Sequence, residues 1–301
     1  ICEQLYQKKI GREDIELLIT QIGSQVWDNQ KSELRIKTGA DRDVETVLSA
    51  TNLVSVDVSK TIYHAVFTAH PVFSLEAENS GKLSEMAGKN LTGPFPDNAY
   101  RPRTQISLQD EHNEAAIAIK NARDAVISLH KIILNEKHSK NLPGWRDIAP
   151  QLFAVSTWVG YDLDGRSDIG WLDSFKLRLS EKKTSLELYL KKLTPFLESY
   201  PQIVEIVNEL SAERRATEAD YVRFSKIGEN GFVDAANLLS ERHDKLIQSK
   251  LFAGRLQKIA ANIQNPEEAI ELLAIAGDIT SHGFGLGELH LRINAVQLAN
   301  A

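Results

Sequence analysis

Three short segments of this sequence place residues that could do chemistry directly after runs typical of buried strands. In the first, His70 and Pro71 close the run at 64–69, whose residues are small, β-branched or aromatic. An imidazole at the end of a strand can donate a hydrogen bond, carry a proton or stabilise an anion near neutral pH. A histidine in such a place is more often buried and satisfied by a carbonyl group. Both interpretations remain open for His70.

The second segment follows a β-rich run at 152–159. It brings two carboxylates, Asp162 and Asp164, into a turn with Gly165 and Arg166. Carboxylates two positions apart could position cations or an arginine. Asp-Gly is also ordinary turn chemistry, in which an aspartate caps the following helix, and this is the commoner interpretation. The turn lacks the remaining ligands of an EF-hand loop, which excludes calcium binding of that kind.

The third segment has glycines at 283, 285 and 287, followed by Arg292 in the apolar run 286–293. These glycines do not follow a strand and open a helix, which argues against a dinucleotide-binding loop. The arginine is more informative, because a guanidinium in an apolar strand must find an anion to offset its burial. A structural carboxylate or a substrate phosphate could serve.

The elements that must position these residues are mostly helical. Proline's fixed φ suits the first turn of a helix, and Pro201 and Pro266 stand where helices would begin. Long helices between short strands favour an α/β fold, predominantly helical, with parallel strands and helices outside. Three strands cannot close a barrel, so this chain would hold an incomplete one. We predict helices at 12–28, 112–136, 170–196, 201–214, 217–226, 232–261 and 266–280.

Composition narrows the class of protein. Apolar residues make up 42% of the 301 residues and the net charge is −6 with both signs interspersed, which disfavours nucleic acid and anionic membranes as partners. No apolar run reaches the length of a membrane span. Cys2 is the single cysteine, so no internal disulfide can form, as in a reducing compartment such as the cytoplasm.

Organisation along the chain points to one region, 1–301, that belongs to a longer protein. The chain opens with Ile1 rather than Met, and residues 284–298 resemble structure more than a tail. Residues 76–108 are rich in glycine, proline and polar side chains, which predicts a long loop that is functional or mobile.

Taken together, the three segments resemble the bacterial-type phosphoenolpyruvate carboxylase family. Residues 67–71 resemble the beginning of the Thr-Ala-His-Pro-Thr-Glu segment of that family. Residues 156–166 resemble its Ser-Trp-x-Gly-Gly-Asp-Arg-Asp-Gly-Asn-Pro segment, and residues 284–293 its Phe-Gly-x-x-Leu-x-x-Leu-Asp-Ile-Arg-Gln strand. The order and the separations are also similar. The resemblance spans about residues 60–300 and covers the opening part of a family member.

This resemblance implies a reaction and roles for the candidate residues. His70 would act on a carboxyphosphate intermediate, and Arg292 would bind the phosphate of phosphoenolpyruvate. Asp162, Asp164 and Gly165 would lie at the active-site end of a strand in an eight-stranded, TIM-like β/α barrel. The family joins bicarbonate to phosphoenolpyruvate with Mg²⁺ or Mn²⁺, giving oxaloacetate and phosphate, commonly as a homo-oligomer. Its metal ligands and glycine-rich loop would lie beyond residue 301, so we expect these residues alone to be inactive.

The sequence departs from the family pattern at positions that carry charge. The paired arginines that follow the family's His-Pro have no counterpart before Arg101. The loss of two positive charges and a carboxylate should weaken binding of a trianionic substrate by an amount on the order of several kcal/mol, unless Arg166 partly replaces the missing arginine. Other substitutions are Val72 and Phe73 for Thr-Glu, Leu163 for arginine, Arg166 and Ser167 for Asn-Pro, His290 for aspartate and Ile293 for glutamine.

These departures leave two alternatives to a working carboxylase. The chain could belong to a carboxylase-like protein that has lost catalysis and binds a phosphorylated metabolite or another protein. It could also be a helical scaffold whose motif matches are accidental, although three matches in the family's order make that the weakest of the three interpretations.

Overall fold

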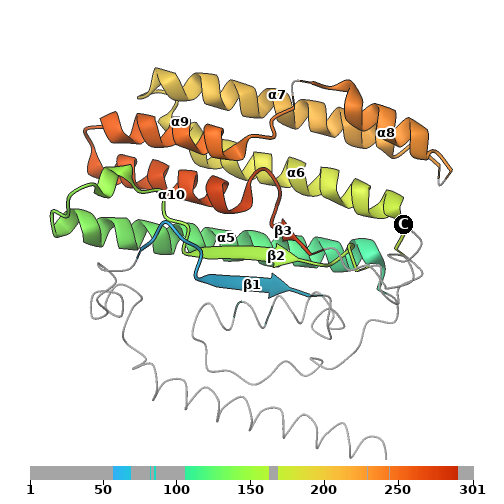
Figure 1. Cartoon of the computed structure of the whole chain (residues 1–301), viewed down its shortest axis with the longest axis horizontal. Coiled ribbons are helices and arrows are strands. Elements are labelled where there is room, and N and C mark those ends of the chain that lie inside the picture. The colour runs from blue at the N-terminus through green and yellow to red at the C-terminus, as the bar shows by residue number, and fades with distance from the viewer. Residues whose placement is uncertain are drawn as a thin grey trace, which may run out of the picture. The chain divides into compact units, whose positions relative to one another are not determined.

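The structure is a computed structural model that describes residues 57–68, 82, 85, 106–162, 169–228, 230–243 and 245–290. Apart from Lys82, Glu85 and Ile106, these residues belong to the larger of two compact units, Asn52–Ala69 with Ser107–Ala301. This unit is predominantly helical with a small parallel sheet, as expected for an α/β fold (Figure 1). The helix predicted at 12–28 and nearly all of the loop predicted at 76–108 lie outside the described residues.

The sheet has three strands in the order β1-β2-β3, and both pairs are parallel. The strands are β1 (Tyr63–Phe67), β2 (Phe153–Thr157) and β3 (Glu288–Leu289). They confirm the three strands and the parallel arrangement predicted from the sequence. Because the strands are parallel, their carboxyl ends share one edge of the sheet. The three described strands do not close into a barrel.

Helix α5 (Leu108–Ser139) covers one face of this sheet (Figure 1). It begins earlier than predicted because Ser107 and Asp110 form a capping box that satisfies the first free N–H groups. Ser107 and Leu108 therefore belong to the start of α5 rather than to the predicted loop. Ile119 on α5 packs against Val155 of β2 in a small apolar cluster.

The remaining helices pack against α5 and one another. All of them except the helix at 232–241 share the largest apolar core, and that helix packs in a separate cluster with Leu172 and Phe224. Three of the others supply most of the buried leucines and isoleucines of the largest core, and α10 is buried along nearly its whole length. None of the described helices has the length and apolar character needed to cross a bilayer. These helices are α6 (Trp171–Leu193), α7 (Pro201–Phe224), α8 (Phe232–Glu241), α9 (Ser249–Asn262) and α10 (Pro266–His282), with short 3₁₀ turns η3 (Trp145–Asp147) and η4 (Thr194–Phe196).

Two helix predictions were wrong. Residues 201–226 were expected to form two helices but form the single helix α7 up to Phe224, because Arg215 and Ala216 are good helix formers. Residues 232–261 were expected to form one helix but form α8 and α9. The helix stops at Arg242, which is extended and reaches back to bind Glu213 on α7. Pro201 and Pro266 begin their helices as predicted.

Candidate functional site at the carboxyl edge of the sheet

The site predicted from sequence depends on residues that directly follow the three strands. The structure describes one of the six, Asp162, a half-buried residue in the turn after β2. Buried hydrogen bonds fix the strands and turns that lead toward the other five residues. The remaining five predicted site residues lie outside the described residues: His70, Asp164, Gly165, Arg166 and Arg292.

The turn that precedes Asp162 is fastened to helix α6. Tyr161 is 2% exposed, and its hydroxyl donates to Glu181 Oε1 at 2.9 Å. Its backbone N–H donates to the carbonyl of Trp158 at 2.8 Å and closes the turn. Gly160 has a φ of 86°, and Leu177 fills the space where a Cβ would lie, so glycine is required there. The chain is therefore rigidly placed one residue before Asp162.

Glu181 connects this turn to the segment that leads into β3. It accepts from Arg178 Nη1 at 2.8 Å and contacts His112 Nε2 at 3.0 Å. Burial alone would raise the pKa of the Glu181 carboxyl, but the bond to His112 and the charge of Arg178 lower it below its usual value. Arg178 Nη1 also donates to the carbonyl of Gly287 at 3.2 Å. One buried carboxylate thus indirectly couples the ends of β2 and the start of β3.

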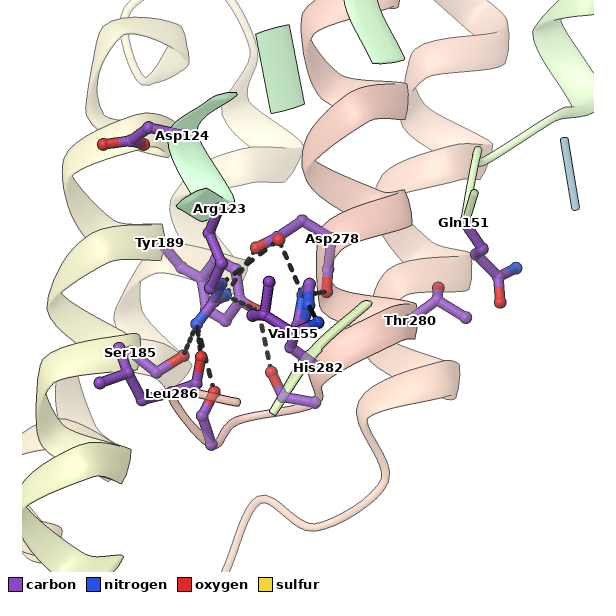
Figure 2. Close-up of polar contacts among 12 residues, drawn as sticks. Arg123, Asp124, Gln151, Val155, Ser185, Tyr189, Asp278, Thr280, His282 and Leu286 are labelled. Atoms are coloured by element: carbon purple, nitrogen blue, oxygen red, sulfur yellow. Dashed lines mark hydrogen bonds and ion pairs between the residues drawn. The ribbon is translucent and has the colours of Figure 1, made fainter. Parts of the chain in front are cut away.

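A second buried network surrounds Arg123, which is fully buried on α5 (Figure 2). Its Nη2 donates to Asp278 Oδ2 on α10 at 2.6 Å, and its Nη1 donates to the carbonyls of Leu286 at 2.9 Å and Gly285 at 3.2 Å. Burial would lower the pKa of the Arg123 guanidinium, but Asp278 outweighs it and raises that pKa. The guanidinium therefore pins the turn before β3 to two helices.

His282 completes this network and attaches β2 to the end of α10 (Figure 2). Its Nε2 accepts from the backbone N–H of Val155 at 3.0 Å, so Nδ1 carries the proton and faces Asp278 Oδ1 at 2.9 Å. Burial would raise the pKa of the Asp278 carboxyl, but Arg123 and His282 together lower it below its usual value. The network fixes where β2 and β3 run, and hence where their carboxyl ends lie.

These buried charges are the residues that the sequence interpretation missed. Arg123 lies four positions after Ile119 and four before Ile127, on the apolar stripe of α5. Asp278 interrupts the apolar stretch 269–279 of α10. A charged residue at a position reserved for the core has to be paired. The sequence therefore marks Arg123 and Asp278 as buried charges that need partners, but it does not show that they pair with each other.

His290 stands at the carboxyl edge, where the family pattern has aspartate. Its backbone N–H donates to the carbonyl of Thr157 at 3.0 Å, which continues the pairing of β3 with β2. Its ring centroid lies 5.8 Å from that of His64 on β1. The substitution noted from sequence therefore lies at the strand ends.

Two surface hollows of about 270 and 430 Å³ lie elsewhere. The smaller one is formed by the start of α5 with α6 and Tyr221, and the larger one by α7 with the chain around Lys245. Neither is lined by residues of the strand ends. The candidate site is therefore defined by the strand ends and by neither of these hollows.

Metal binding has no support within the described ranges. They contain no group of three or more histidine, cysteine, aspartate or glutamate side chains that could hold a metal ion. The resemblance implies ligands for Mg²⁺ or Mn²⁺ only beyond residue 301.

The described residues define an α/β protein, mostly helical, with a small parallel sheet. No model of a known protein family matches the chain, and no curated protein matches it either.

Proposed function

We propose that this chain carries the phosphoenolpyruvate-binding edge of a phosphoenolpyruvate carboxylase-like protein. The full-length protein would join bicarbonate to phosphoenolpyruvate, giving oxaloacetate and phosphate, in a TIM-like β/α barrel of which β1 to β3 are one part. One observation carries the proposal. Three parallel strands end at one edge, and each overlaps one of the three motifs in the sequence.

Covalent geometry supports this convergence. His70 is three residues beyond the end of β1, and Arg292 is three residues beyond the end of β3. A chain extends by at most about 3.5 Å per residue, so each lies within roughly 10 Å of its strand end. The outer strands are themselves about 10 Å apart, because neighbouring strands are spaced by about 4.8 Å. These limits allow both residues to reach one substrate the size of phosphoenolpyruvate, which the proposal requires.

The residue types suit the two charged ends of the substrate. The Arg292 guanidinium would bind the phosphate through two hydrogen bonds. The His70 imidazole would act as a general acid or base on the carboxyphosphate formed from bicarbonate. Ligands of parallel α/β sheets bind outside the carboxyl ends of the strands, and both residues follow such an end in the sequence. The full-length protein would be a cytoplasmic homo-oligomer that binds Mg²⁺ or Mn²⁺.

A second candidate is a carboxylase-like protein that binds a phosphorylated metabolite or a protein partner without turning it over. His290 favours it, because this imidazole occupies the carboxyl edge in place of the family's aspartate. The substitutions at Val72, Phe73 and Leu163 point the same way.

Calorimetry of the 301-residue chain with phosphoenolpyruvate tests the binding claim. We expect a Kd of about 1 mM or tighter, weakened about tenfold or more by Arg292→Ala, since a charged hydrogen bond contributes about 1.5–3 kcal/mol. Arg215→Ala, an exposed arginine on α7, is the matched control and should leave the Kd unchanged. Absence of binding, or equal effects of the two variants, would refute the proposal. Oxaloacetate formation by a longer chain then separates the carboxylase from the non-catalytic binder.

A further inference from the structure

Two side chains from the outer strands meet across the middle strand of the sheet. His64 Nε2 on β1 and Glu288 Oε2 on β3 are 3.5 Å apart. Since β2 lies between these strands, both side chains must pass over it on the face opposite Val155, which packs toward α5. They can do so because β2 presents only small residues there: Ala154 is paired with His64, and Ser156 with Glu288.

Ser156 lies beneath this bridge and lacks a hydrogen-bond partner. Ser156 is fully buried, and among the described residues its hydroxyl oxygen has no hydrogen-bond partner. Buried hydroxyls are nearly always hydrogen-bonded, so the Ser156 hydroxyl has the capacity to bind a further group, such as a water molecule or a ligand. The hydroxyl needs an acceptor on the side where His64 and Glu288 meet.

The contact between His64 and Glu288 is weak enough for a ligand to replace the carboxylate. The His64 side chain is 33% exposed and that of Glu288 50%, and their separation is longer than a hydrogen bond. An exposed pair of this kind contributes little to stability, so the carboxylate can leave at small cost. The His290 ring, 5.8 Å from that of His64, supplies a second imidazole on the same side.

We propose that this bridge marks a binding site for a small planar oxyanion, which is bicarbonate in the proposed reaction. The two imidazoles and the Ser156 hydroxyl bind the oxyanion. The Glu288 carboxylate, which has the same planar two-oxygen face, takes its place in the ligand-free protein. The site rests on the proposed function only for the choice of bicarbonate. The carboxyl edge of the sheet would then have two anion-binding sites, one for the oxyanion and one for the phosphate of phosphoenolpyruvate.

Histidine ring resonances in ¹H–¹⁵N spectra of the full 301-residue chain test the site during titration with bicarbonate. We expect the rings of His64 and His290 to shift in a saturable way with one millimolar-range Kd. Formate should cause the same shifts, because it shares the planar face, whereas tetrahedral sulfate should bind more weakly.

Two substitutions should act in opposite directions on that Kd. Glu288→Gln removes a competing charge and should tighten bicarbonate binding about fivefold, the factor given by two unit charges about 4 Å apart in water. His64→Ala should weaken it about tenfold or more, because a hydrogen bond to a charged group is lost. Glu241→Gln and His243→Ala, exposed and distant, are the matched controls and should leave the Kd unchanged.

The proposal is overturned if bicarbonate shifts neither ring, if sulfate binds as tightly as bicarbonate, or if Glu288→Gln weakens binding. Both key variants change part-exposed side chains, so the fold survives and the result is interpretable. Phosphoenolpyruvate calorimetry on the same sample separates the two proposals. Bicarbonate binding without phosphoenolpyruvate binding would leave this site standing and remove the carboxylase, and the reverse result would remove this site alone.

Discussion

Replacing Arg123 by methionine should destabilise the larger unit more than any other single change to a described charged residue. The variant leaves the Asp278 carboxylate fully buried without its main counter-ion. Breaking a buried ion pair in this way costs about 3–5 kcal/mol. The carbonyls of Gly285 and Leu286 also lose their donor, which adds about 1 kcal/mol or more. We therefore expect the free energy of unfolding to fall by about 4 kcal/mol or more at pH 8.

The pH dependence of this loss identifies its cause. In the wild-type protein the pKa of Asp278 is lowered, so its contribution to stability is lost only at strongly acid pH. In Arg123→Met the Asp278 carboxyl keeps His282 as a partner but loses the guanidinium, so burial should raise its pKa. Its protonation on acidification should then stabilise the folded state. The stability difference between variant and wild type should thus shrink as the pH falls from 8 to 5.

Urea denaturation followed by tryptophan fluorescence measures both quantities. Arg123→Met combined with Asp278→Leu should be less destabilised than Arg123→Met alone, because the buried charge is gone. Arg215→Met, on the exposed side of α7, should change stability by less than about 0.5 kcal/mol. A loss below about 1 kcal/mol for Arg123→Met, or a loss that does not vary with pH, would refute the reasoning.

Three further predictions concern single side chains. Burial lowers the pKa of His130 to about 4, so this residue should reduce the free energy of unfolding by about 2 kcal/mol when the pH falls from 7.5 to 5. Urea titrations at the two pH values should show that His130→Leu removes this dependence. Ser156→Ala should raise the thermal midpoint, by about 1 kcal/mol of stability, because it deletes an unsatisfied buried hydroxyl; a lowered midpoint in calorimetry would contradict this. Gly277→Ala should lower the midpoint, since its Cβ would collide with the backbone carbonyl of Pro150, whereas Gly254→Ala, with open space around it, should not.

The strands and most helix positions could be predicted because their signals are local. Short β-rich runs ending at polar turns located all three described strands, and prolines located the starts of α7 and α10. The error at 232–261 was different in kind. Its helical pattern continues through the break, and the chain leaves the helix because Arg242 binds Glu213, twenty-nine positions away. Sequence periodicity carries no information about such a contact.

The same limit applies to the candidate site. The motifs at 156–166 and 284–293 could be found by their residue types, but the pairing of Arg123 with the carbonyl of Leu286 joins residues 163 positions apart. His64 was visible in the sequence only as part of a strand. Its meeting with Glu288 depends on strand order and on the small residues of β2, which become evident only once the register is known.

The most direct test of the central claim is a map of backbone amide shifts as phosphoenolpyruvate is added to the ¹⁵N-labelled chain. The claim is that the carboxyl edge of the sheet receives the substrate. The account predicts that the largest shifts among the described residues fall on Thr68, Asp162 and His290, which follow the three strands. Largest shifts at the opposite edge, around Ile62 and Gln151, or no saturable shift at millimolar concentration, would contradict it.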